Sequence, residues 1–522
     1  MAALIPDLNY RAKVREASTK EQVDALFAQW WPLVYVDGAD KTALLERWFG
    51  VVLVDERVHG AKLPLFATSQ SSEGELTGDS AGLVCEPSTA ATAGRDDFAR
   101  LPQFWALEVS ADKDADGRMV VYKVQHIDPL SEVRSGEHLC QVLVKNTYYK
   151  EWQADGYHFH RQQCTLFEGA ALWQPKNAAG YQYSFASWPK YLAGWTDGTK
   201  TALTCGTNLH PAINVSHTAG LTKWRSRNAN YAGLGYRTVK WQNSMFALKY
   251  ARKGNSGLIE GCTSYNYEYA AAVSEEGVER VVLTTAQAAN LLEGSAVSIA
   301  GRGGSCVRIA SIEEVEIGGT TYAAVNLDNG GTTFNVTAGT TKLSAMPWWS
   351  GRCDTVKGLD GSCTNNTNGK EPGMIQGTEF GIGAYDITAD ALMLWTQDGN
   401  NYALDLYTCD DPSKASGSAI TADYQKAAPT LEDPANGWQY IQDEAVSPAV
   451  WPLAVGGGAG SSNGCRAALY VSRSSGVRAV WGFGNLDNGG HCGRGCLNSN
   501  NAPGNANWNG CLGAPSNSVQ TC

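Results

Sequence analysis

Three short motifs in this sequence hold the kinds of residue that bind metal ions or carry redox chemistry. The first, Asp112-x-Asp114-x-Asp116-Gly117, copies the start of a calcium-binding loop. Its twelfth position is Lys123, where calcium requires a bidentate glutamate, and the flanking segments have the pattern of strands instead of helices. A solvated hairpin turn is therefore the favoured interpretation of this motif, and a calcium site is the alternative.

The second motif is a pair of histidines. His158 and His160 are two residues apart, which places both imidazoles on one face of a predicted strand, and Cys164 follows closely. Because a closed metal site takes about four ligands, two histidines are a weak signal. Ordinary packed or surface histidines are the favoured interpretation, and an iron or zinc site is the alternative.

The third motif, Cys492-x3-Cys496, could bind copper or act as a redox pair. A metal pair prefers thiolates on a rigid frame, whereas these two cysteines lie in a segment of loop-forming residues. The sequence contains no phosphate-binding loop that ends in Lys-Ser or Lys-Thr, and no His-Glu-x-x-His. We therefore expect a protein that binds a partner, and not an enzyme.

Composition narrows the classes of partner. The net charge of −11 comes without a basic stripe, so we expect no nucleic-acid partner. No apolar run reaches the roughly 18 residues of a spanning helix, so we expect no membrane insertion. Fourteen cysteines are scattered along the chain, and its first residues contain no apolar signal-like segment. The sequence therefore predicts synthesis in a cytoplasm, with reduced thiols.

Residues 481–509 are the most distinctive segment. Eight asparagines lie between Asn485 and Asn509, yet the segment holds no lysine or glutamate. Asn and Gly form turns, while disordered segments are typically rich in charge and poor in aromatic residues. Here Trp481, Phe483 and Trp508 interrupt the polar residues. We expect an ordered surface that offers amides and rings to a partner, as antibody paratopes do.

The elements that must position these residues fall into three parts. Residues 1–150 are expected to form an α+β module. Ser18-x-x-Glu21 is a capping box that begins a helix, which Pro32 is expected to end. A second helix is expected over residues 41–49, directly after Asp40. Strand-like runs follow at residues 51–54, 104–110, 119–124 and 141–145.

The rest of the chain is expected to form one domain, residues 151–278 and 344–522, into which a small all-β domain, residues 279–343, is inserted. Two helices are expected in the host domain, at about 216–231 and 238–252. The inserted domain is indicated by short runs of strand-forming residues separated by Gly-rich turns. Its strands are expected at residues 281–283, 296–299, 307–315 and 321–325.

Several blocks of this sequence resemble the target proteins of diversity-generating retroelements carried by tailed bacteriophages. They are M-P-W-W-S-G-R-C-D at 346–354, I-E-G-C-T-S-Y at 259–265 and, most specifically, G-V-R at 476–478 with G-F-G-N-L at 482–486 and N-A-N-W-N at 505–509. The resemblance extends over about residues 150–515. It implies a C-type-lectin-like fold, in the variant shared with formylglycine-generating enzymes. The segment at 377–385 departs from the family pattern, in which an aromatic-rich loop is expected.

In that family, reverse transcription of a template repeat randomises adenines, so asparagine codons become positions of variable side chains. The resemblance implies a fixed frame of Phe483, Leu486, Leu497 and Trp508, from which the variable side chains stand outward. An Asn-rich connecting loop without any partner is the alternative. The expected ligand-binding surface consists of Trp481, Phe483, Asn485, Asp487, Asn488, His491, Arg494, Asn498, Ser499, Asn500, Asn501, Asn505, Asn507 and Asn509.

The resemblance also implies a place and partners for the protein. It implies a tail-fibre or tail-tip adhesin on the phage virion that binds a protein or glycan receptor on the bacterial surface, without a cofactor or metal. The N-terminal module would dock to other tail proteins, and the chain would form a homotrimer. The alternatives are an oxidase of the formylglycine-generating type at Cys492 and Cys496, a calcium-dependent lectin, and a structural tail protein that binds no receptor.

Overall fold

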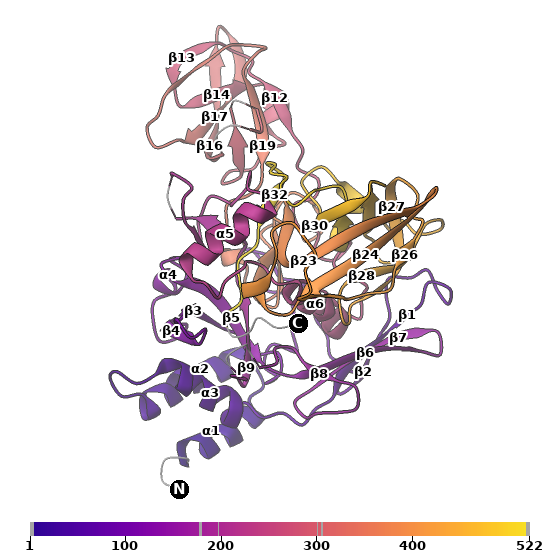
Figure 1. Cartoon of the computed structure of the whole chain (residues 1–522). Coiled ribbons are helices and arrows are strands. Elements are labelled where there is room, and N and C mark those ends of the chain that lie inside the picture. Colours follow the sequence, from indigo (N-terminus) through magenta and orange to yellow (C-terminus); the bar gives the residue numbers. More distant parts are fainter. Residues whose placement is uncertain (1–4, 177–179, 197, 300, 304–305, 518–522) are drawn as a thin grey trace.

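The structure is a computed structural model that describes residues 5–176, 180–196, 198–299, 301–303 and 306–517 (Figure 1). Over these ranges the chain forms seven α-helices, and strands predominate. The α+β class expected from the sequence is confirmed. No helix in the described ranges is both long enough and apolar enough to span a membrane.

Three helices open the chain: α1 (Ile5–Glu16), α2 (Lys20–Val34) and α3 (Lys41–Arg47). The N-cap of α2 is Thr19, whose side chain accepts a hydrogen bond from the backbone of Gln22, so the cap lies one residue after the predicted Ser18. Pro32 lies inside the helix instead of ending it. As predicted, α3 follows Asp40, whose carboxylate caps its first amides.

The strand predicted over residues 51–54 is wrong. The chain continues from α3 into a π-helical turn, Trp48–Val52. The side chains of Trp48, Phe49 and Val52 are buried in one apolar core with Trp105. A short run that is buried on all sides has no periodicity that separates helix from strand, so the sequence pattern could not decide between them.

Two antiparallel sheets follow. Their strands are β1 (His59–Pro64), β2 (Glu75–Gly78), β3 (Leu107–Lys113), β4 (Met119–Val124), β5 (Leu139–Lys145), β6 (Tyr148–Ala154), β7 (Tyr157–Gln163), β8 (Ala171–Leu172) and β9 (Phe185–Pro189), with the short helix α4 (Leu130–Val133) between β4 and β5. The orders are β2-β1-β7-β6-β8 and β4-β3-β5-β9. The expected boundary after residue 150 is therefore wrong, because it falls inside β6, and β1 and β5 pair with strands beyond it.

A separate β module, which we call the inserted module, projects from one end of the molecule (Figure 1, top). Its elements are β12 (Glu268–Ala270), β13 (Glu275–Val278), β14 (Arg280–Leu283), α7 (Thr285–Ala288), β15 (Ala296–Ser298), β16 (Val307–Ile317), β17 (Thr320–Asp328), β18 (Phe334–Val336) and β19 (Lys342–Met346). They form a sheet of order β12-β19-β15-β16-β17-β14 and the pair β13-β18. The module spans residues 268–346, so the expected limits of 279–343 leave out β12 and β13.

The C-terminal part is built on one large sheet, with β20 (Gly361–Ser362), β21 (Gly373–Ile375) and β22 (Thr378–Phe380) in a small sheet beside it. Its strands are β23 (Tyr385–Asp398), β24 (Asn401–Cys409), β25 (Tyr424–Lys426), β26 (Leu431–Glu432), β27 (Gly437–Ala445), β28 (Trp451–Val455), β29 (Ala468–Val471), β30 (Gly476–Phe483), β31 (Gly493–Asn498) and β32 (Gly510–Leu512). The order is β25-β24-β23-β30-β31-β29-β27-β28, and β26 and β32 pair with β24 and β23.

The segment between the two parts holds the short pair β10 (Gly194–Trp195) and β11 (Leu203–Thr204) and two helices, α5 (His217–Arg227) and α6 (Tyr236–Tyr250). α5 lies within the range predicted for it, and α6 begins and ends two residues before its predicted range. α6 is buried over most of its length. It contacts β1 and β7 of the N-terminal part and β23 and β31 of the C-terminal sheet, so it lies between the two parts of the molecule.

Candidate ligand-binding surface

The Asn-rich segment forms the end of β30, a turn, β31 and the loop that leads to β32. Nine of the fourteen residues expected on its surface are exposed or half-buried: Asp487, Asn488, His491, Asn498, Asn500, Asn501, Asn505, Asn507 and Asn509. The other five are buried, at 0–3% exposure: Trp481, Phe483, Asn485, Arg494 and Ser499. For Trp481, Asn485, Arg494 and Ser499 the expected place on the surface is wrong, and Phe483, which was expected both on the surface and in the frame, belongs to the frame.

Arg494 is turned inward by specific partners. Its guanidinium forms an ion pair with Asp386 and donates to Oε1 of Gln242 at 2.8 Å. It also lies 5.5 Å from the ring centre of Phe380 and 5.0 Å from that of Phe483. Burial raises the pKa of Asp386, and the Arg494 charge opposes that rise. Arg494 therefore belongs to the internal frame of the sheet.

Phe483 is held in a closely fitted slot. Its backbone has a φ of +73°, which is uncommon for a residue with a side chain. A Cβ on Gly261 would lie 2.7 Å from the tip of the Phe483 ring, and a Cβ on Gly381 would lie 2.5 Å from it. These two glycines make room for the ring, and Leu486 and Leu497 are buried in the same core. Three of the four frame residues expected from the sequence, Phe483, Leu486 and Leu497, are therefore buried, while Trp508 is half-buried.

Short-range hydrogen bonds from backbone amides to asparagine side chains hold the turns of the segment. The side chain of Asn485 accepts from the backbone amide of Asp487 at 2.9 Å, and that of Asn488 accepts from the amide of Asn485 at 3.0 Å. The side chain of Asn498 likewise accepts from the amide of Asn500 at 2.9 Å. Such turns fix the backbone without burying the side chains that follow them.

Three aromatic residues from outside the segment lie beside it. Trp438 and Tyr440 lie two residues apart on β27, and Tyr470 faces Trp438 across the pairing of β27 with β29. The rings of Trp438 and Tyr470 are 5.1 Å apart at an angle of 62°. We call these three half-buried residues the aromatic floor. The aromatic floor was not expected from the sequence, in which the alternation Trp438-x-Tyr440 was the available signal.

His491 connects the aromatic floor to the Asn-rich segment. Its imidazole lies nearly parallel to the indole of Trp438, at 4.5 Å and 6°, and 5.1 Å from the ring of Tyr440. Its Nδ1 donates to the carbonyl oxygen of Asn488 at 3.1 Å. Burial lowers the pKa of His491, and that hydrogen bond opposes the change. The imidazole is therefore neutral at pH 7 and offers a flat face.

An amide and a hydroxyl also lie beside the aromatic floor. Asn498 on β31 pairs with Tyr470 on β29, and a Cβ on Gly490 would lie 2.6 Å from the side chain of Ser461. Half-buried rings that stand beside amides and a hydroxyl combine rigid contact area with adaptable hydrogen bonds. This chemistry suits recognition of a ligand.

The inserted module meets the other end of the segment. The guanidinium of Arg302 lies 4.5 Å from the ring centre of Trp508, and it hydrogen-bonds Asn266. Burial lowers the pKa of Arg302, whereas the charges of Asp487 and Glu268 raise it. The exposed side chain of Asp487 therefore lies within electrostatic reach of the inserted module.

The thiols proposed for the oxidase alternative lie inside the protein. Cys492 is 1% exposed, and Cys496 faces a core that includes Ile441 and Ala467. Burial raises the pKa of Cys496 to about 12 and that of Cys492 well above its usual value. Both groups are protonated thiols at neutral pH, whereas copper requires the thiolate.

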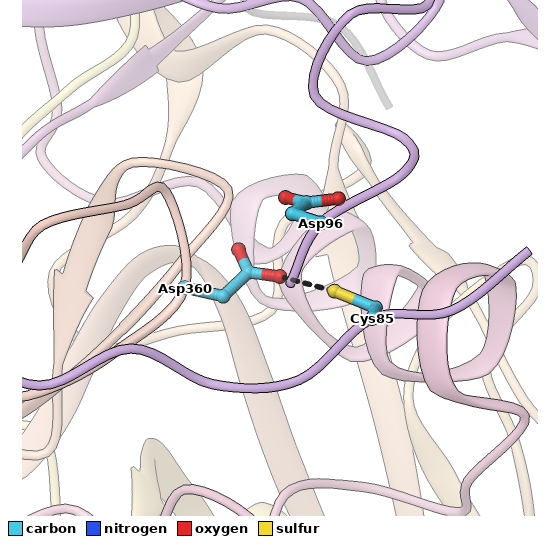
Figure 2. Close-up of side chains that lie close together, drawn as sticks. All are labelled: Cys85, Asp96 and Asp360. Carbon is cyan, nitrogen blue, oxygen red and sulfur yellow. Dashed lines mark hydrogen bonds between the residues drawn. The ribbon is translucent and has the colours of Figure 1, made fainter. Parts of the chain in front are cut away.

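One other cluster has the residue types of a metal site. The side chains of Cys85, Asp96 and Asp360 converge, and the Cys85 thiol donates to Asp360 at 3.4 Å (Figure 2). The buried ammonium of Lys249 lies 2.8 Å from Asp96 and 2.6 Å from Asp360. Although burial lowers the pKa of Lys249, the two carboxylates hold it above its usual value. Lys249 thus supplies the positive charge that a cation would bring.

The first motif of the sequence has the structure that was favoured for it. Asp114 and Asp116 lie at the turn of the β3–β4 hairpin, and Asp112 lies near the end of β3. Asp114 Oδ1 accepts from the amides of Asp116 and Arg118 at 2.9 and 2.8 Å. Asp112 forms ion pairs with Arg227 and His138. The hairpin turn is confirmed.

The histidine pair lies on β7 as two buried side chains. His158 Nδ1 is 3.2 Å from a carboxylate oxygen of Glu151, and His160 Nδ1 is 2.8 Å from the hydroxyl of Tyr149. Burial lowers the pKa of His160 to about 4, so it is neutral at physiological pH. Both groups pack as ordinary core histidines, as favoured from the sequence.

The histidines also line a small cavity together with Glu444, one oxygen of which is buried without a hydrogen-bond partner. Burial raises the pKa of Glu444 to about 7, as it does for Glu379 and Asp390. Such a carboxyl binds its proton more tightly in the folded protein than in the unfolded chain. Its contribution to stability therefore falls as the pH rises from the unfolded pKa toward 7.

A Glu444→Gln variant tests this dependence. We expect the free energy of unfolding of the wild type, relative to the variant, to fall by about 2 kcal/mol between about pH 5.5 and pH 8. Histidines titrate alike in both proteins, so their contributions cancel. Denaturant titrations at several pH values measure the difference, with the exposed Glu432→Gln as control. A difference that does not change with pH would show that Glu444 is ionised throughout.

Comparisons with known proteins give no assignment. A scan against protein-family models finds no match to the chain, and a search of curated proteins finds none either.

Proposed function

We propose that this chain is a receptor-binding protein of a bacteriophage tail, and that the aromatic floor and the exposed part of the Asn-rich segment bind a receptor on the bacterial surface. One observation carries the proposal. His491 and Asn498 of the Asn-rich segment lie directly beside half-buried rings from β27 and β29, and the exposed Asn and Asp side chains of the same segment stand on a buried internal frame. A surface of this kind can change its side chains while the sheet beneath is unaffected.

Diversification by a retroelement would act on the exposed positions. Asp487, Asn500, Asn505 and Asn507 are exposed, so substitutions there leave the core intact. Arg494 and Ser499 are excluded from this set because their side chains are buried. The proposal thus covers fewer positions than the sequence pattern indicated.

A C-type-lectin-like fold of residues beyond about 190 is part of the proposal. It is supported by the two helices α5 and α6 beside one large, mainly antiparallel sheet. It is also supported by the parallel pairing of β32 with β23, which returns the end of the chain to the middle of that sheet. The N-terminal sheets and helices would dock the chain to other tail proteins, and a homotrimer on the virion would increase avidity.

The proposal is tested by adsorption to bacteria. The labelled protein should bind cells of a susceptible strain saturably, and a variant with alanine at Asp487, Asn500 and Asn505 should bind at least about tenfold more weakly. The variant should keep its melting temperature, since none of the three side chains is buried. Equal adsorption by both proteins would place the receptor site elsewhere.

The genome gives an independent test of diversification. We expect a near-identical repeat beside a reverse-transcriptase gene, which differs from codons 480–509 only at adenines. Differences spread over all four bases would contradict diversification while leaving receptor binding open to the adsorption test.

A further inference from the structure

The inserted module has an open groove between α7, with the turn that follows it, and the strands β16 and β17. The floor of the groove is apolar: the side chains of Leu291 and Ala323 are buried, and those of Leu292 and Ile312 are half-buried. Its volume is about 540 Å³, and pockets of about 300–1,000 Å³ take ligands of several side chains in size. The groove is therefore large enough to accept part of another molecule.

Three glutamates, Glu293, Glu313 and Glu314, line the same groove, and all three are exposed. Glu293 Oε1 accepts from the backbone amide of Ile312 at 2.9 Å, which holds this carboxylate beside the apolar floor. Glu313 Oε1 accepts from the hydroxyl of Ser311 at 2.7 Å. The groove thus combines an apolar floor with carboxylates that are in contact with water.

The positive charges near the groove are engaged elsewhere. Residues 268–346 include nine acidic and only four basic residues. Within the described ranges, each of the four has another partner: Arg280 pairs with Glu275, Arg308 with Asp328 and Lys342 with Glu268, and Arg302 stacks on Trp508. Arg352 lines the groove from outside the module, but its guanidinium pairs with Glu371 at 2.5 Å. The charge of the three glutamates is therefore available to a partner.

We propose that this groove binds a segment of another protein in which lysine or arginine lies next to an apolar residue. The alkyl stems of lysine and arginine cover apolar surface while their charged heads remain at its polar margin. In the groove the stems and the apolar residue would cover Leu292 and Ile312, and the heads would pair with the glutamates. Opposite charge would also guide the approach of the partner and fix its register.

Other classes of partner fit the groove less well. A lipid surface is too flat to enter a concave site, and an inorganic cation would make no use of the apolar floor. The module projects from one end of the molecule, where a neighbouring protein can reach it (Figure 1). The partner is distinct from the receptor proposed above, because the aromatic floor lies on β27 and β29 of the C-terminal sheet. Either proposal can therefore fail without the other.

Three labelled hexapeptides test the proposal by fluorescence anisotropy on the intact chain. One alternates lysine with leucine, the second lysine with serine, and the third glutamate with leucine. The lysine–leucine peptide should bind at least about tenfold more tightly than the other two, because it alone supplies both the charge and the apolar side chains. Its affinity should fall when NaCl is raised from about 0.05 to about 0.5 M. Equal binding of the lysine–serine peptide would overturn the proposal, as would no binding of the lysine–leucine peptide.

Two double variants with the same change in net charge locate the site. Glu313→Lys with Glu314→Lys reverses the charge in the groove and should weaken binding of the lysine–leucine peptide at least about tenfold. Glu276→Lys with Glu432→Lys is the control: both side chains are exposed, one on β13 of the module and one on β26. The control should weaken binding less than about twofold. Equal losses in the two variants would show that the peptide responds only to net charge, and would overturn the proposal.

Cross-linking of the wild-type protein does not depend on the folding of any variant. A carbodiimide joins a carboxylate directly to a lysine amine that lies against it. Treatment of the complex with the lysine–leucine peptide, followed by digestion and mass spectrometry, should place most of the cross-links at Glu293, Glu313 or Glu314. Cross-links found mainly at other carboxylates would overturn the proposal.

Discussion

An Arg494→Asn substitution is expected to lower the free energy of unfolding by about 3–5 kcal/mol, although it only adds one more asparagine to an Asn-rich segment. The substitution removes one partner of a buried ion pair and leaves the Asp386 carboxylate without its counter-charge. It also leaves Oε1 of Gln242 without its donor and opens a void beside the rings of Phe380 and Phe483.

Chemical denaturation monitored by tryptophan fluorescence measures this loss. The reverse substitution at an exposed position, Asn505→Arg, is the control, and it should change stability by less than about 0.5 kcal/mol. Replacing both buried partners, as Arg494→Met with Asp386→Leu, should recover most of the loss, because no unpaired charge then remains. A stable Arg494→Asn protein would show that this position is free to vary after all.

A Trp438→Ala substitution is expected to weaken adsorption to receptor-bearing cells by about 30-fold, the effect of a central aromatic contact at an interface. The indole supports the imidazole of His491 and the ring of Tyr470, so its removal disorders both sides of the candidate surface. Trp438→Phe keeps a flat ring at the same place and should retain most of the binding. Equilibrium titration of labelled protein against cells gives the affinities.

Trp152 is the matched control for Trp438. It is also a half-buried tryptophan on a strand, stacked on Phe159 at 5.3 Å, but it lies on β6 in the N-terminal part. Trp152→Ala should leave adsorption unchanged. If Trp152→Ala and Trp438→Ala weaken binding equally, the loss comes from general destabilisation, and the aromatic floor has no special part in recognition.

Local signals in the sequence predicted local structure. The Asp40 cap located α3, and the strand pattern at residues 119–124 matched β4. The runs separated by Gly-rich turns predicted β14, β15, β16 and β17 of the inserted module, because a hairpin is specified by its own turn and its own alternation. The boundary after residue 150 failed because β1 pairs with β7, about a hundred residues further along the chain, and no local pattern encodes such a partner.

For the candidate site, too, the sequence predicted the local features and missed the long-range contacts. Composition alone located an ordered, polar segment with exposed amides. It could not separate Arg494 from Asn500, because the partners that bury Arg494 are more than a hundred residues away, at Asp386 and Gln242. It also could not place Trp438 and Tyr470 beside His491, since that contact depends on the order of strands in the sheet.

The position of α6 decides how the protein can be divided. Three polar side chains along this one helix reach three different places: Gln242 meets Arg494, Asn243 donates to Glu444 at 2.8 Å, and Lys249 is paired with Asp96 and Asp360. If the C-terminal half were produced alone, the apolar side of α6 that packs on β1 would be exposed to solvent. Lys249 would also lose Asp96, one of its two carboxylate partners. The smallest soluble unit that retains the recognition surface therefore includes the N-terminal sheets, and both halves should melt in one cooperative transition.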